Sequence, residues 1–186
     1  MSEEMIIRHC SPTLAGIKTG NLFSCFYKSK TQLTREIRLL NQKLGPKGLR
    51  VLPLRMKEGR ALIYLYRPKA LAADLADRQA REILEEKEYI PAHADRCIVR
   101  LIQRLGTQEE FPHEIGLFLS YPPEDVLGFI QNKAENHKCS GCWKVYGDEE
   151  RAKALFQKYK DCTRAYCLRW QQGQPLEGLA VADRAS

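Results

Sequence analysis

The spacing of apolar residues predicts a chain in which helices predominate. Ser11 and Pro12 have the character of an N-cap and a first-turn proline, so they predict the start of a short helix. Apolar residues three and four apart predict a second helix over residues 31–44. The same spacing recurs later in the chain, over residues 68–89, 94–105, 122–130 and 149–170. We therefore expect five or six helices.

Shorter apolar segments between these helices predict strands. Residues 51–54 and 61–66 flank a Lys-Glu-Gly turn and predict a β-hairpin, in which Pro53 marks an edge strand. The apolar run 114–121 and the short segment 142–146 predict two further strands. The expected fold class is α+β, with a small, mainly antiparallel sheet of about four strands covered by five or six helices.

The length and composition are those of one globular domain. The 186 residues are 44% hydrophobic and 28% charged, which is enough apolar material to close a core without disulfides or metal ions. We expect a single domain over residues 1–171 and a frayed polar tail over residues 172–186. No segment has the ~18 apolar residues of a membrane span, and the first residues lack the apolar region of a secretion signal. These features predict a cytoplasmic protein with no membrane partner.

Positive charge is concentrated in the first third of the chain. Residues 1–60 contain 12 Lys and Arg against 4 Asp and Glu, a net +8, whereas the remainder has a net charge of −1. This distribution fits either a solvated basic face or a surface for an anionic ligand or an acidic partner protein. Nucleic acid is a less favoured partner, because the sequence contains no known nucleic-acid-binding module. The candidate anion-binding residues are Lys18, Lys28, Lys30, Arg35 and Arg38, with Lys43.

The chain contains seven cysteines, an odd number. In a cytoplasmic protein they are expected to be reduced thiols and not a disulfide framework. Three of them are expected only to pack: Cys25, Cys97 and Cys167. The patterns that suggest chemistry lie around Cys10 and in the Cys139/Cys142 pair.

Three separated segments give the chain a resemblance to a known family. They are residues 9–18 (HCSPTLAGIK), 111–119 (FPHEIGLFL) and 143–148 (WKVYGD). On these segments, and over most of the chain from about residue 5 to residue 165, the sequence resembles a bacterial family catalogued as domain of unknown function 3793, typical of anaerobic Gram-positive bacteria. The resemblance implies a single-domain protein and supplies no activity.

Cys10 is the first candidate for chemistry. It stands one residue before a predicted helix start, where backbone N–H groups and the helix dipole would stabilise a thiolate. Its segment also resembles the nucleophile segment of papain-like bacteriocin-processing peptidases, although Ser11 replaces their glycine and no Gln stands upstream to complete an oxyanion hole. His113 and Asp125 follow in the chain order of a Cys-His-Asp triad, as base and orienting group. The alternative is a buried core thiol and a packed histidine.

The Cys-x2-Cys turn is the second candidate. Cys139 and Cys142, with Cys162 on the following predicted helix, supply three thiols for Zn or Fe, and His137 is a further candidate ligand. Cys167 lies about 140° around that helix from Cys162, which disfavours a site with all four thiols. A redox dithiol is a third interpretation, disfavoured because a strand follows the turn where thioredoxins have a helix.

Three functions from different classes stay open. The first is a thiol-binding or metal-binding accessory protein of anaerobic metabolism. The second is a cysteine-nucleophile hydrolase or transferase. The third is a non-enzymatic module that binds an anionic ligand or a partner through its basic first third.

Overall fold

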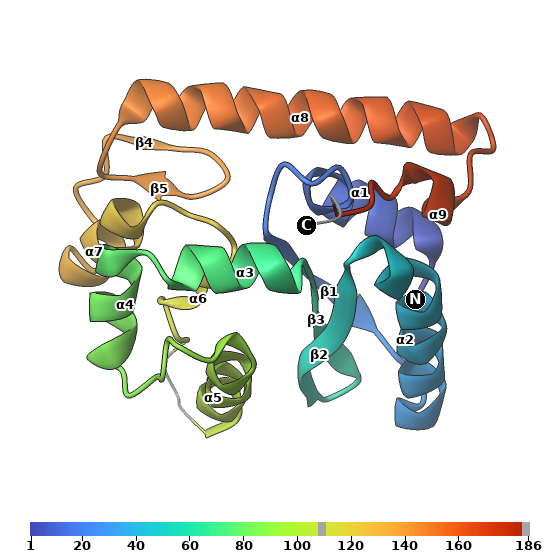
Figure 1. The fold of residues 1–186 in the computed structure, drawn as a ribbon, viewed down its shortest axis with the longest axis horizontal. Coiled ribbons are helices and arrows are strands. Elements are labelled where there is room, and N and C mark those ends of the chain that lie inside the picture. Colours follow the sequence, from blue (N-terminus) through green and yellow to red (C-terminus); the bar gives the residue numbers. More distant parts are fainter. Residues whose placement is uncertain (108–110, 184–186) are drawn as a thin grey trace. The chain divides into compact units, whose positions relative to one another are not determined.

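The computed structural model describes residues 1–107 and 111–183. Over these residues the chain forms nine α-helices, one short 3-10 helix and five strands (Figure 1). Backbone contacts divide the chain into two compact units: unit 1 is Met1–Lys69 with Asp161–Ser186, and unit 2 is Ala70–Lys160. No helix in the described part of the chain is long and apolar enough to cross a membrane.

Each unit contains helices and strands. The elements of unit 1 are α1 (Glu3–Leu14), β1 (Gly20–Phe26), α2 (Lys30–Leu44), η1 (Gly45–Lys47), β2 (Arg50–Lys57), β3 (Arg60–Tyr66) and α9 (Leu176–Leu179). The elements of unit 2 are α4 (Arg78–Glu85), α5 (Ala94–Thr107), α6 (Ile115–Phe118), α7 (Pro123–Gln131), β4 (Cys139–Ser140) and β5 (Lys144–Val145). Helix α3 (Pro68–Leu75) begins in unit 1 and continues in unit 2, and helix α8 (Glu149–Gln171) begins in unit 2 and ends in unit 1. The α+β prediction is confirmed.

Unit 1 is built on a three-stranded antiparallel sheet with the order β1-β3-β2. The predicted hairpin is confirmed as β2 and β3, with a register shift between Pro53 and Arg55 on the edge strand β2. Strand β1, which pairs with β3 from Gly20↔Tyr66 to Phe26↔Arg60, was not predicted. Its sequence GNLFSCF alternates only weakly, because Asn and Ser interrupt the apolar positions.

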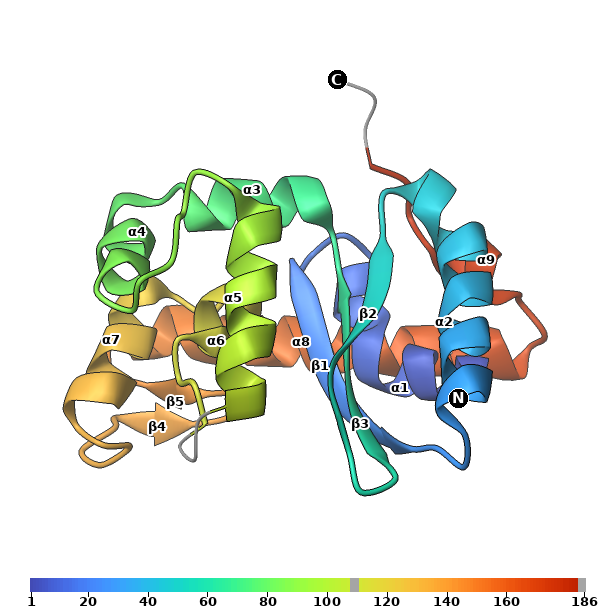
Figure 2. The same cartoon turned by 90° about the horizontal axis from the view of Figure 1, so that it is seen from below.

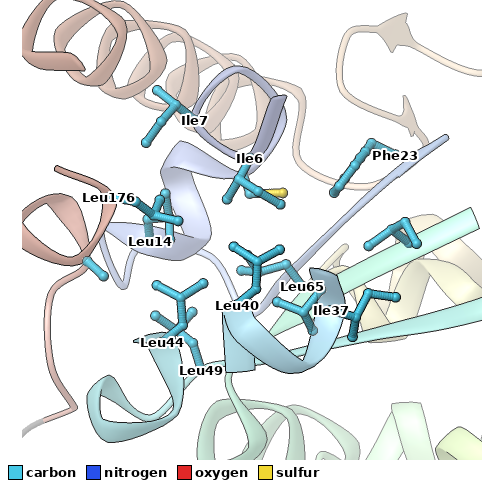
Figure 3. Close-up of a cluster of buried hydrophobic side chains, with 14 of the residues drawn as sticks. Ile6, Ile7, Leu14, Phe23, Ile37, Leu40, Leu44, Leu49, Leu65 and Leu176 are labelled. Carbon is cyan, nitrogen blue, oxygen red and sulfur yellow. The ribbon is translucent and has the colours of Figure 1, made fainter. Parts of the chain in front are cut away.

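One face of this sheet packs against helices α1 and α2 (Figure 2). Every second residue of β3, namely Ala61, Ile63 and Leu65, points into the resulting core. Figure 3 shows this core, in which leucines and isoleucines of α1, α2 and α9 meet the sheet. Burial of these apolar side chains is the main stabilising term for unit 1.

Helix α1 begins nine residues earlier than the sequence pattern indicated. Ser2 is its N-cap, and the Ser2 hydroxyl accepts a hydrogen bond from the Met5 backbone N–H. Glu3 and Glu4 in the first turn complement the positive end of the helix dipole. Pro12, predicted to be a first-turn proline, lies inside the helix.

The predicted strand over residues 114–121 is wrong. Residues 115–118 form the short helix α6, and Ser120 follows in a left-handed turn with φ of 54°. The run is buried on all sides, and an apolar run of this length does not distinguish a buried strand from a buried helix. Gly116 is needed here, because a Cβ atom would lie 2.8 Å from the Val126 side chain.

The segment after α8 also differs from expectation. A frayed tail was predicted from residue 172, but residues 172–183 include α9, whose Leu176 and Leu179 side chains are buried. The backbone N–H of Val181 donates to the Leu14 carbonyl at the end of α1. Backbone hydrogen bonds and apolar burial therefore hold this segment onto unit 1.

Candidate functional site

Cys10 lies in the third turn of α1 and is completely buried in the core of unit 1. Burial raises the pKa of the thiol strongly, and the positive charge of Lys18 lowers it by less. The expected position at a helix N-terminus was wrong, because Ser2 and not Ser11 caps the helix. These surroundings stabilise a neutral packing thiol and not a thiolate nucleophile.

The rest of segment 9–18 forms the binding site of a buried arginine. The Arg67 guanidinium donates to the carbonyls of Thr13 (2.8 Å) and Leu14 (2.9 Å), and also to the Val181 carbonyl and the Asp183 carboxylate. Gly16, with φ of 73°, turns the chain directly over the guanidinium. The first motif of the chain therefore has a structural role in joining α1, β3 and the C-terminal segment.

Asp125, the proposed orienting group of the triad, is buried in unit 2 with both carboxylate oxygens occupied. One oxygen accepts from the backbone N–H groups of Tyr146 and Gly147 (2.7 Å each), and the other accepts from the Trp143 indole N–H (2.7 Å). Asp125 thus fastens helix α7 to the segment 143–148. None of its hydrogen bonds involves His113, whose ring instead lies edge-on against Phe129 at 4.9 Å.

The predicted metal ligands do not form a coordination group. Cys139 pairs with Val145 across the β4–β5 hairpin, and the charge of Glu149 acts on its thiol. Burial, followed by the negative charge of Glu149, raises the pKa of the Cys139 thiol. Cys142 is exposed in unit 2, and Cys162 packs against the core of unit 1. In residues 1–107 and 111–183 no three His, Cys, Asp or Glu side chains are arranged to hold a metal ion.

The predicted anion-binding residues have different surroundings. Lys18 is buried, with 8% of its surface exposed, and Lys43 is paired with Glu3 and Glu177. The others lie on the surface of unit 1, in or just before α2: Lys28, Lys30, Arg35 and Arg38. Their role in anion binding stays a prediction.

A pocket of about 440 Å³ opens in unit 2 around the second motif of the chain. Its apolar wall is formed by Phe111, Pro112, Phe129 and Ile130. Its cationic wall is formed by Lys87, Arg104 and Lys133. Glu114 is the one carboxylate among the lining residues, so the lining has a net positive charge. The combination of an apolar wall with a few convergent polar groups, in a volume of about 300–1,000 Å³, is typical of small-molecule sites.

Arg104 is held in this pocket by a buried acid. Its Nε donates to Oε1 of Glu114 at 2.6 Å, and the Tyr89 hydroxyl donates to the same oxygen at 2.8 Å. Burial, and then the charge of Glu114, raise the pKa of Tyr89 strongly, so the phenol stays a hydrogen-bond donor. The terminal guanidinium nitrogens of Arg104 donate to no other described residue. The bond at Nε fixes the direction of these terminal nitrogens.

The pocket-lining segment that carries Lys133 has an unusual backbone. Lys133 (φ 49°) and Ala134 (φ 66°) are both left-handed, and the Ala134 N–H donates to the Phe129 carbonyl at the end of α7. The Lys144 ammonium donates to the Ala134 carbonyl at 2.7 Å. Two successive non-glycine residues with positive φ are costly and need such support from their surroundings. Lys144 belongs to the third motif, so this motif supports a segment that lines the pocket.

Segments 111–119 and 143–148 therefore build one site, and segment 9–18 builds the core of unit 1. Comparison with protein-family models agrees with the resemblance of these segments: the family described as "Protein of unknown function (DUF3793)" matches residues 6–180. The chain belongs to this family. No curated protein and no solved structure matches the chain. The function of this family member must therefore be inferred from its own structure.

Most residues of the pocket were not identified from the sequence. The sequence suggested His113 only as a catalytic base. Arg104, Lys87 and Lys133 lie in separate segments of the chain and come together only in the folded unit. One signal was present. Glu114 begins a fully apolar run, and a carboxylate buried in such a run requires a cationic partner.

Proposed function

We propose that this protein binds a small organic anion in the pocket of unit 2, with the anionic group on Arg104 and an apolar or aromatic body against Phe111 and Phe129. The observation that supports the proposal is the fixed guanidinium of Arg104, held through Nε by buried Glu114 and engaged by no other described residue at its terminal nitrogens. A guanidinium oriented in this way matches a carboxylate or phosphate with two parallel hydrogen bonds.

The charges around Arg104 strengthen this assignment. The Arg104 side chain is only 14% exposed, so an anion bound there is screened less by solvent than at the protein surface. Glu114 neutralises one positive charge, and Lys87 and Lys133 remain to attract the ligand. Burying Arg104 costs desolvation, which the bond to Glu114 offsets in the free protein. The ligand therefore needs at least one anionic group.

The apolar wall defines the remainder of the ligand. Phe129 presents its ring to the pocket beside the edge-on ring of His113, and the Phe111 side chain is 42% exposed. Exposed aromatic surface beside fixed charge favours a flat apolar body that covers the rings. The half-buried His113 ring supplies a further polar group for orientation.

The geometry gives less support to the two thiol hypotheses. The Cys10 thiol is buried with a raised pKa, and both oxygens of Asp125 are engaged by other groups. Burial and the charge of Glu149 raise the pKa of the Cys139 thiol. Of the three predicted classes we therefore retain an anion-binding role, and we place it at the pocket and not at the basic first third of the chain.

Calorimetric titration with four probes tests the proposal: phenyl phosphate, benzoate, inorganic phosphate and benzyl alcohol. Phenyl phosphate and benzoate should bind, inorganic phosphate more weakly and benzyl alcohol weakest of all, because only the first two satisfy both walls. Substitution Arg104→Lys keeps the charge but removes the paired donors, and should weaken binding roughly 10- to 100-fold.

The control is Arg96→Lys, an exposed arginine on the same helix α5. Lys133→Asn removes a second pocket charge while tolerating the left-handed backbone, and should weaken binding without loss of folding. Equal affinity for benzyl alcohol and phenyl phosphate would contradict the proposal. So would an Arg96→Lys variant that loses as much affinity as Arg104→Lys.

A further inference from the structure

The second face of the unit 1 sheet has an open end that is rich in charge. Cross-strand partners point to the same face of a sheet, so the register gives two neighbouring rows. The first row is Phe26, Arg60 and Lys57, and the second is Ser24, Leu62 and Arg55. All of these side chains are exposed except Leu62, which is half-buried. The face therefore presents one aromatic ring among three cations at the end of the β2–β3 hairpin.

Phe26 is the most exposed large apolar side chain described, at 78%. The Arg60 guanidinium carbon lies over this ring, 5.1 Å from its centre, in a cation–π contact between neighbouring strands. The next residue, Tyr27, donates its N–H to the Gly59 carbonyl, which fixes Phe26 beside the hairpin turn. An exposed ring held this firmly is a ready stacking surface.

The cations of this face lack strong counter-charges. Among residues 1–107 and 111–183, neither Arg55 nor Arg60 forms an ion pair, and the Lys57–Glu58 pair is exposed on both sides. Such exposed pairs contribute little. Lys28 and Lys30 follow Phe26 in the chain and add further exposed positive charge. A second copy of the chain would present the same positive charge, which disfavours self-association through this face.

We propose that this face, defined by Phe26, Arg55, Lys57 and Arg60, binds single-stranded nucleic acid. Proteins that bind single strands combine cations that follow the phosphates with aromatic side chains on which bases stack, often on an open sheet face. An acidic protein segment would use the cations but not the planar surface of Phe26 and Arg60, so the observations favour a nucleic acid. This site is independent of the pocket in unit 2.

Fluorescence anisotropy with a labelled 12-nucleotide oligo-dT, at several salt concentrations, tests the proposal on the full chain. Phe26→Ala should weaken binding roughly 5- to 150-fold through loss of base stacking, and Phe26→Tyr should preserve it. The double substitution Arg55→Glu with Arg60→Glu should weaken binding and reduce the slope of log K against log salt by about 1.4, since each lost phosphate contact contributes about 0.7.

The matched control is Lys158→Glu with Arg164→Glu, two exposed cations of α8 with the same change in net charge. It should leave the salt slope within error of the parent chain. The proposal is overturned if oligo-dT does not bind, or if the control lowers the slope equally. It is also overturned if Phe26→Ala binds oligo-dT normally while a poly-glutamate peptide competes at equal affinity, because that result assigns the face to an acidic protein.

Discussion

Replacement of Arg67 by methionine should destabilise unit 1 more than any surface change. The Arg67 side chain is 5% exposed and donates to the carbonyls of Thr13, Leu14 and Val181 and to the Asp183 carboxylate. Methionine fills much of the volume but donates nothing. Each hydrogen bond lost from the charged guanidinium costs about 1.5–3 kcal/mol, and less where the carbonyl keeps a backbone donor. Thr13 keeps the N–H of Gly16 and Leu14 keeps the N–H of Val181, whereas Asp183 is 24% exposed and can be rehydrated. We expect a loss of about 3–5 kcal/mol in the free energy of unfolding, a large part of the stability of an ordinary domain.

Urea denaturation followed by circular dichroism measures this loss, and Asp183→Asn is the control. The amide of asparagine still accepts a hydrogen bond, so this control should lose about 1 kcal/mol or less. Hydrogen exchange locates the effect: amides in residues 11–18 and 176–183 should exchange faster in Arg67→Met, while those in residues 94–105 of unit 2 should not. A loss below 1 kcal/mol, or equal acceleration in all three segments, refutes the role given to Arg67.

Three further predictions concern buried side chains in the two units. At pH 8 iodoacetamide should label Cys142 but not Cys10, as mass spectrometry would show, and early labelling of Cys10 would contradict its burial. Since burial raises the pKa of Cys10 above its unfolded value of about 8.5, folding should lose stability as pH rises above that value. Asp125→Asn should lower the free energy of unfolding in urea by about 2–4 kcal/mol. The amide NH₂ of asparagine would replace one carboxylate oxygen, so a donor would face either the Trp143 indole N–H or the two backbone N–H groups. The helix-capping residue Asp148 is the control: Asp148→Asn should cost below about 0.5 kcal/mol, and equal losses would contradict the bracing role of Asp125.

The sequence predicted those parts of the fold in which a clear pattern has one structural solution. The amphipathic helix α2 and the β2–β3 hairpin were predicted, because their apolar residues repeat with the period of the element. The strand predicted over residues 114–121 was wrong, because a run buried on all sides has no periodic pattern that separates a strand from a helix. The start of α1 was misplaced because Ser11 and Pro12 satisfy the rules for a helix start, although Ser2 satisfies them as well.

The candidate site was harder to predict than the fold, since its residues are brought together only by tertiary structure. Arg104 and Lys133 are separated in the sequence by α6 and α7, and no local spacing relates them. The exposed face of the unit 1 sheet depends on β1, which was not predicted, so Phe26 and Arg60 could not be recognised as neighbours. Cysteines are recognisable as candidate nucleophiles or metal ligands from the sequence alone. Their reactivity depends on burial, which the sequence did not predict for Cys10.

The three motifs of the family have separate physical roles in this chain, and these roles make the assignment testable by position. Residues 9–18 supply carbonyls to Arg67, so changes there should act on the stability of unit 1 and leave ligand affinity in the pocket unchanged. Residues 111–119 place His113 and Glu114 at the pocket, so changes there should act on affinity. Residues 143–148 act on the pocket indirectly, because Lys144 holds the left-handed turn at Ala134 and Asp125 fastens α7 to this segment.

A substitution such as Lys144→Met should therefore reduce both the stability of unit 2 and the affinity for phenyl phosphate. A pure stability change at Lys144, with the affinity of the folded protein intact, would show that the turn does not shape the pocket.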